Sequence, residues 1–183
     1  REVYDAKAAE THPGDKARFE FDPPTGDQEV DLAFDFTGAV REFYREVHGR
    51  NGIDANGMKF ISTVNYGSGY ENAFWNGSQM TYGRPGLSSP FATFVLLDVC
   101  GHEIAHGVTE FVSNLEYYGQ SGALNEHMSD VFGEMIEMRV KGLPSAQGDW
   151  LIGNGIWKPT VNGVALRSML NPGTAYNDPS VGK

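Results

Sequence analysis

The spacing of apolar positions changes along the chain between a helical and a strand-like period. From Asp31 to Val47, large apolar residues recur at intervals of four, four, three and four, which predicts an amphipathic helix that ends at Gly49. Alternating β-branched and aromatic residues predict a strand from Met58 to Tyr66. A similar pattern from Ala73 to Tyr82 is interrupted by Asn76-Gly77, which predicts a hairpin. Helices and strands are therefore both expected, in a mixed fold.

Two longer segments later in the chain have helical character. Residues 97–112 read LDVCGHEIAHGVTEFV, and their apolar ends predict a buried helix. After a loop, residues 122–140 predict a second long helix. Residues 1–29 are polar and contain Pro13-Gly14, which predicts loops and short extended pieces, and the region after Gly142 is rich in Gly, Pro and Asn.

The first of these helices contains the pattern H-E-x-x-H, at His102-Glu103-Ile104-Ala105-His106. Two histidines four residues apart lie on the same face of a helix, so both rings can bind one metal ion. Glu103 lies about 100° round the helix, where its carboxylate can reach a water on the metal without being a ligand. The pentapeptide thus supplies half of a zinc site and a candidate general base.

The same residues allow a second interpretation. H-E-x-x-H is a loose pattern, and apolar flanks are also typical of a core helix whose histidines find other partners. Burial of polar side chains costs free energy unless a partner satisfies them, which a metal ion can do. A third ligand decides between the two readings, because catalytic zinc sites usually have three protein ligands.

A glutamate suited to that position, Glu126, follows His106 after nineteen intervening residues. Its surroundings, Gly122-Ala123-Leu124-Asn125-Glu126-His127-Met128-Ser129-Asp130, resemble the second motif of the thermolysin-like metallopeptidases. Residues 70–80 (YENAFWNGSQM) and 165–169 (ALRSM) resemble that family's substrate-edge strand and substrate-arginine segment. The resemblance covers about residues 66–171, while the short region before it is closer to the protealysin-type branch.

The resemblance implies an α+β, thermolysin-like fold. A sheet-bearing N-terminal lobe, residues 1–112, would include the central zinc helix, and residues 113–183 would begin a helical C-terminal lobe. It also implies a zinc endopeptidase with ligands His102, His106 and Glu126. Glu103 would take a proton from the zinc-bound water as it attacks the peptide carbonyl. Asp130 would hold one zinc histidine by a hydrogen bond.

Further positions are implied to hold the substrate. Tyr117 would stabilise the oxyanion, although a tyrosine beside Tyr118 can also serve packing alone. Asn72 and the backbone of Ala73 would pair with the substrate main chain. Arg167 would bind the carbonyl beyond the cleaved bond, although an isolated arginine is more often a surface charge. Apolar residues at the family's pocket positions imply broad cleavage on the N-terminal side of bulky hydrophobic residues: Val99, Ile152 and Leu166.

Acidic residues on the second helix suggest a further metal site. Carboxylates recur at spacings of four, four and three, at Glu126, Asp130, Glu134 and Glu137. Like charges at these separations destabilise a helix unless cations offset them. The resemblance implies calcium ligands at Asp98, Glu134, Glu137, Asp149 and the carbonyl of Leu151. Positions that serve a second calcium hold Leu151 and Asn154 here, so one ion is expected; a solvated acidic face is the alternative.

One element of the family site has no counterpart in this sequence. The family completes its site with a histidine beyond the substrate arginine, but the five histidines here are His12, His48, His102, His106 and His127. We therefore expect the C-terminal remainder to be a second polypeptide, produced by a nick near Lys183. Two alternatives are an incomplete zinc-binding fragment and a zinc aminopeptidase, although no exopeptidase motif precedes His102.

Composition narrows the class of partner. With Lys plus Arg at 14 and Asp plus Glu at 24, the formal charge of −10 disfavours nucleic acid and anionic membranes. The expected partners are protein and peptide substrates. The only cysteine, Cys100, is expected to be a buried core thiol. Because Arg1 is not an initiator methionine, we expect a processed or trimmed start. Secretion is expected, with unconventional export or an intracellular location left open.

Overall fold

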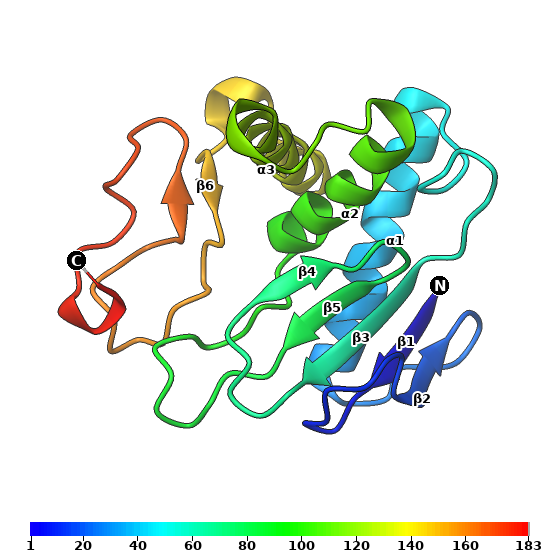
Figure 1. Cartoon of the computed structure of the whole chain (residues 1–183), viewed down its shortest axis with the longest axis horizontal. Coiled ribbons are helices and arrows are strands. Elements are labelled where there is room, and N and C mark those ends of the chain that lie inside the picture. Colours follow the sequence, from blue (N-terminus) through cyan, green and yellow to red (C-terminus); the bar gives the residue numbers. More distant parts are fainter. Residues whose placement is uncertain (183) are drawn as a thin grey trace.

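A five-stranded sheet, one helix behind it and two helices beside its edge form the body of the computed structural model, which describes residues 1–182 (Figure 1). The strand order is β2-β1-β3-β5-β4. The strands of this sheet are β1 (Glu2–Asp5), β2 (Asp15–Phe19), β3 (Ile61–Tyr66), β4 (Ala73–Trp75) and β5 (Met80–Gly83). The α-helices are α1 (Gln28–His48), α2 (Leu97–Val112) and α3 (Gly119–Lys141). The mixed α+β class expected from the sequence is confirmed.

The boundaries of α1 follow from its caps. The Asp27 side chain accepts a hydrogen bond from the Val30 backbone N–H and so begins the helix three residues earlier than the apolar spacing predicts. At the other end Gly49 adopts the left-handed conformation with φ of 61°, as the sequence predicts. The apolar face of α1 packs on β1 and β3 and forms the centre of the hydrophobic core.

The N-terminal segment contributes more to the sheet than its composition suggests. Strands β1 and β2 pair antiparallel, and β1 also pairs in parallel with β3, with Val3 opposite Ser62. The predicted hairpin is confirmed: β4 and β5 are antiparallel, with Ala73 opposite Tyr82. Strand β4 ends the sheet, so one of its edges is free to pair with another extended chain.

Helices α2 and α3 cross closely because two glycines face each other. A Cβ built on Gly101 would lie 3.0 Å from the Cα of Gly133, and one on Gly133 would lie 2.5 Å from the Asp98 carbonyl oxygen. No side chain fits between the backbones at this crossing. The close approach brings the histidines of α2 to the first half of α3.

Two short strands that the sequence does not predict follow α3. After the 3₁₀ turn η1 (Ser145–Gln147), β6 (Leu151–Ile152) pairs antiparallel with β7 (Arg167–Ser168), and the described chain ends near η2 (Pro179–Val181). This tail lies beside α3, on the opposite side of the molecule from β2 (Figure 1). Lys183, near which a nick was expected, lies outside the described residues. No helix within residues 1–182 has the length and apolar character needed to cross a bilayer.

Candidate metal centre and cleft

Three side chains from α2 and α3 converge in a geometry that suits a tetrahedral metal. His102 Nε2 and His106 Nε2 lie 3.0 Å apart, and they lie 3.3 and 3.5 Å from the two carboxylate oxygens of Glu126. Ligands bound tetrahedrally to zinc at about 2.0–2.1 Å are separated by about 3.3 Å. Two imidazole nitrogens and one carboxylate are also a donor set that zinc prefers, so these residues fit the ion.

The opposite nitrogen of each ring is held by a side chain of α3. His102 Nδ1 lies 2.7 Å from Asp130 Oδ1, and His106 Nδ1 lies 2.6 Å from Asn125 Oδ1. Because these oxygens accept, each Nδ1 donates, which turns the Nε2 atoms toward the centre. The sequence argument anticipated a partner such as Asp130 but missed Asn125. Its only signal was its place directly before Glu126.

Electrostatics at His102 reflects its acidic neighbours. Burial lowers the pKa of His102, but its hydrogen bonds with Asp130 and Glu126 outweigh burial and raise the pKa to about 9. Burial also lowers the pKa of His106, and the neighbouring His102 lowers it further. A cation bound at the Nε2 atoms would replace the proton that these carboxylates favour on His102.

Glu103 is buried on the adjoining face of α2 and does not belong to the three-residue cluster. Its Oε2 accepts a hydrogen bond from the Trp75 backbone N–H at 3.2 Å, which links α2 to the edge strand β4. Burial raises the pKa of this carboxyl group to about 7. A carboxyl group with such a pKa exchanges protons readily near neutral pH.

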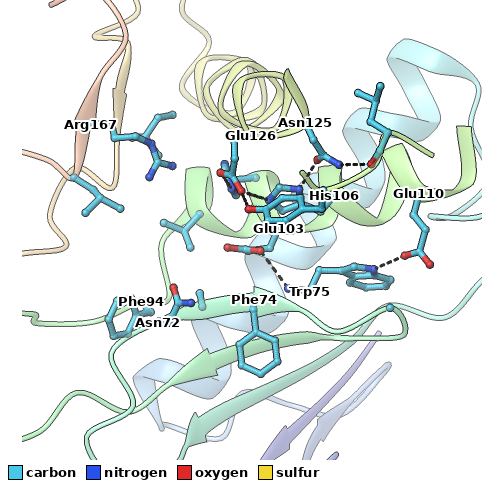
Figure 2. Close-up of a pocket in the computed structure, with 18 of the residues that line it drawn as sticks. Asn72, Phe74, Trp75, Phe94, Glu103, His106, Glu110, Asn125, Glu126 and Arg167 are labelled. Carbon is cyan, nitrogen blue, oxygen red and sulfur yellow. Dashed lines mark hydrogen bonds and ion pairs between the residues drawn. The ribbon is translucent and has the colours of Figure 1, made fainter. Parts of the chain in front are cut away.

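These residues form the floor of a cavity of about 660 Å³ between β4, α2, the α2–α3 loop and the β6–β7 pair (Figure 2). Asn72 and Ala73 also line it. The predicted pocket residues Val99, Ile152 and Leu166 are part of the lining, as are two apolar residues that the sequence argument did not name, Phe94 and Ile156. The Leu166 N–H donates to the Ile152 carbonyl, and Phe94 lies on the same side as Arg167, which makes this the apolar end of the cavity (Figure 2). Tertiary contacts alone assemble this apolar end, because its members come from separate segments of the chain.

Arg167 and Tyr117 each contact a residue of the three-residue cluster or its hydrogen-bond partner. The Arg167 guanidinium donates to both oxygens of Asp130, at 2.9 and 2.6 Å, and lines the cavity. This ion pair was not anticipated, and it connects Arg167 to the same carboxylate that orients His102. The Tyr117 ring packs edge-on against His106 at 5.7 Å between centroids, and its hydroxyl donates to Glu126.

A second acidic cluster is formed by the later part of α3 and the segment that follows it. Ligand atoms of Glu134, Glu137 and Asp149 lie within 4.8 Å of one another. Oxygen Oε2 of the buried Glu134 has no hydrogen-bond partner among residues 1–182, and burial raises the pKa of this carboxyl group to about 7. A buried carboxylate oxygen without a donor is the kind of atom that a hard cation satisfies.

The other expected calcium ligands occupy different positions around this cluster. Asp98 lies outside the three-carboxylate group, and its carboxylate accepts hydrogen bonds from the backbone N–H groups of Val99 and Gly153. Burial nevertheless raises the pKa of Asp98 to about 6, and the charge of Glu137 adds to that shift. The Leu151 N–H donates to Asp149 Oδ1 at 3.0 Å. Asn154 Nδ2 donates to Asp149 Oδ2 at 3.1 Å, so an amide already occupies that side.

Two residues near the metal motif lie where the sequence predicts. The Cys100 thiol is fully buried, 3.8 Å from Thr37 Oγ1, on the side of α2 away from the cavity. His127 is exposed on α3 and is not in the metal cluster, although it adjoins Glu126 in sequence.

Replacing Asp130 by Asn is expected to weaken zinc binding by about 10–100-fold, because His102 loses the charged acceptor that orients its ring. Isothermal titration of the chain with zinc measures the affinity. Asp35→Asn, a change to an exposed carboxylate on α1, serves as the charge-matched control. An unchanged affinity in Asp130→Asn would show that the orienting hydrogen bond has no role in metal binding.

Comparison with known proteins agrees with this geometry. Residues 2–110 match the family described as the thermolysin metallopeptidase catalytic domain, and residues 113–183 match its alpha-helical domain. An extracellular metalloprotease of Pectobacterium carotovorum subsp. carotovorum is 44% identical over 183 residues, which is 100% of this chain and 52% of that protein. Protease PrtS of Photorhabdus sp. (strain Az29) is 43% identical, with 100% and 49% covered.

A solved structure shows the same likeness in three dimensions. The precursor of protealysin, a metalloproteinase from Serratia proteamaculans, superposes with a TM-score of 0.95 at 43% identity, covering 100% of this chain and 56% of that one. The chain spans about half the length of the two curated relatives named above. On its sequence and its fold, the chain belongs to the thermolysin metallopeptidase family.

Proposed function

We propose that this chain carries the zinc-binding and proton-accepting part of an endopeptidase. The observation that carries the proposal is the juxtaposition of the His102, His106 and Glu126 cluster with the separate, buried carboxyl group of Glu103 in one cavity. A purely structural zinc site is closed by four protein ligands, whereas a catalytic site has three and an open position. Three ligands beside a general base favour hydrolysis.

The role of each side chain follows from its atoms. When bound to the three-residue cluster, zinc supplies a Lewis acid that polarises a carbonyl and makes water more acidic. Glu103 would accept the proton of the attacking water and pass it to the leaving amine. Tyr117 lies beside the cluster and would donate its hydroxyl hydrogen to the oxyanion once the hydroxyl leaves Glu126.

The edge of β4 offers the substrate a template. Asn72 O and Asn76 N are hydrogen-bonded toward β5, so strand alternation turns the carbonyl of Ala73 and the N–H of Trp75 toward the cavity. An extended peptide would add as a further strand at this edge, with the Asn72 side chain assisting. Arg167, held by Asp130, would donate to the carbonyl beyond the cleaved bond.

The apolar end of the cavity supports a substrate preference. Val99, Ile152 and Leu166 would receive a bulky hydrophobic side chain directly after the cleaved bond. Each additional methylene contributes about 1–3 kcal/mol of discrimination in such a pocket, so the preference is broad. Cleavage would therefore occur on the N-terminal side of residues such as Leu or Phe.

The acidic cluster would hold one calcium ion. Glu134, Glu137 and Asp149 supply carboxylate oxygens, and the unpartnered Glu134 Oε2 supports the assignment. Because the carbonyls of Trp150 and Ile152 bond toward β7, strand alternation turns the Leu151 carbonyl toward the cluster as a neutral ligand. Asp98 would be a further ligand, because its buried carboxylate lies close enough to Glu134 and Glu137 to shift their electrostatics.

Apolar residues on α3 also favour a further packing partner. Leu124, Met128 and Val131 lie along its outer side at spacings of four and three, and none of them belongs to the core of the described chain. We take this stripe, together with the greater length of the relatives, to favour a C-terminal remainder that packs there, as a second polypeptide or as a continuation. The two-lobe division at residues 112 and 113 remains part of this proposal.

The names of the relatives support a proposal for the cellular location of this protein. One of them is named an extracellular metalloprotease, which favours secretion of the protein to which this chain belongs. Its substrates would then be proteins and peptides outside the cell.

The test is cleavage of an internally quenched peptide by the zinc-loaded protein, alone and with its C-terminal remainder added. We expect cleavage before a bulky apolar residue, loss of activity with a chelator and recovery with zinc. A peptide with a blocked N-terminus excludes an aminopeptidase if it is cleaved equally well. Zinc binding without cleavage in either preparation would instead support the incomplete, non-catalytic fragment.

A further inference from the structure

The two ends of the cavity differ in charge. Arg167 is the only Lys or Arg among the described residues that line it, and its guanidinium is paired with Asp130. The opposite end is lined by Trp75 and Glu110, and no lysine or arginine of the described cavity lining accompanies that carboxylate. Figure 2 shows Arg167 on one side of His106 and Glu126, and Trp75 with Glu110 on the other.

The indole of Trp75 is held in a defined position at this acidic end. Its Nε1 donates to Glu110 Oε2 at 3.1 Å. One helical turn earlier, a Cβ on Gly107 would lie 2.9 Å from Trp75 Cε2 and 3.0 Å from Cζ2, so the ring rests against the backbone of α2. Gly107 and Glu110 are three residues apart and therefore share one helix face. Together they fix both the plane and the edge of the ring.

The same contact leaves part of Glu110 available. Only Oε2 is hydrogen-bonded within the described chain, and the residue is exposed at the cavity rim. An aromatic ring beside a carboxylate suits the long side chain of a lysine or arginine, whose methylenes lie on the ring and whose charge meets the oxygen. A carboxylate side chain at the same place would be repelled.

We propose that Glu110, positioned with Trp75, makes the cleft select a cationic side chain on the N-terminal side of the cleaved bond. The direction rests on the proposed function, in which Arg167 and the apolar pocket receive the residues after that bond. A substrate antiparallel to β4 places its earlier residues beside Trp75, which agrees with that direction. The preferred sequence would therefore have a basic residue two or three positions before the bond and a bulky apolar residue directly after it.

The experiment uses the zinc-loaded full-length protein and peptides that differ only by Lys, Gln or Glu two or three residues before the cleaved bond. Because one exposed charge pair is involved, we expect kcat/KM to favour Lys over Glu by roughly two- to five-fold at low salt. Glu110→Gln keeps an oxygen acceptor for the indole but removes the charge, so the ratio of kcat/KM between the Lys and Glu peptides should fall to about one. Glu42→Gln on α1, outside the cavity, should leave the preference unchanged.

A binding measurement separates this inference from the proposed function. In a Glu103→Gln background, fluorescence anisotropy reports the Kd of labelled Lys and Glu peptides without cleavage. If the wild type cleaves peptides but its Lys preference is absent, or persists in Glu110→Gln, the inference is wrong. If no peptide is cleaved but the Kd values still favour Lys in a Glu110-dependent way, the proposed function fails while the cationic selectivity stands.

Discussion

Replacing Glu103 by Gln is expected to lower kcat by about 10²–10⁴-fold, because the variant loses the group that accepts the proton of the attacking water. The amide has nearly the same shape and retains an oxygen for the Trp75 N–H bond. The metal cluster of His102, His106 and Glu126 does not include Glu103, so zinc affinity should remain within a few-fold. The measurement is the initial rate with a quenched peptide, alongside zinc content.

Two further variants serve as controls for this result. Glu42→Gln, an exposed change on α1, should retain full activity. A Glu126→Gln variant should lose zinc as well as activity, whereas Glu103→Gln should lose only activity. Undiminished cleavage by zinc-replete Glu103→Gln would rule out Glu103 as the general base.

Withdrawal of calcium is expected to destabilise the fold. At a free calcium concentration about 100 times Kd, binding to the folded state alone contributes about 2.7 kcal/mol, which corresponds to a Tm shift of roughly 5–10 °C for a chain of this size. Thermal unfolding of the zinc-loaded protein, with and without calcium, measures the shift. Glu134→Gln should remove most of it because Glu134 contributes the buried, unpartnered oxygen. An equal calcium shift in the variant would contradict the site.

The same carboxyl groups predict the pH dependence of the calcium-free protein. In the folded chain, burial raises the pKa of Glu134 from 4.5 to about 7 and that of Asp98 from 3.8 to about 6. The unfolded chain therefore loses these protons first as the pH rises, and stability should fall between about pH 4 and pH 7. Saturating calcium should flatten this decline, and Glu134→Gln should reduce it without calcium. Chemical denaturation at a series of pH values tests both statements.

Local spacing was sufficient to find the parts of the site that lie within one helix. The four-residue interval between His102 and His106 places both rings on one face, because the helix repeats every 3.6 residues. The same reasoning identified α1, the β4–β5 hairpin and the acidic spacing along α3. Where caps act, the boundaries shifted: Asp27 begins α1 earlier than the apolar pattern does.

The spacing of residues along the sequence could not predict contacts between distant segments. The pairing of β1 with β3 joins residues nearly sixty positions apart, and the two-residue strands β6 and β7 are too short to show a period. The bonds from Asn125 to His106 and from Arg167 to Asp130 depend on how α3 and the tail approach α2. None of these pairs leaves a periodic pattern in the sequence.

The sequence by itself therefore predicted the candidate chemistry of the protein: a histidine pair suited to a metal ion, a neighbouring carboxylate suited to a base, and a possible third ligand at a family-specific distance. Only the tertiary structure decided how these groups are supported and what surrounds them. The Gly101–Gly133 crossing sets the separation between α2 and α3, and hence the distances within the metal cluster. The tertiary structure also decided that Glu110 contacts Trp75, because their hydrogen bond joins helix α2 to the edge strand β4. Helical periodicity is a local property of the backbone, whereas such contacts arise only when separate elements pack together.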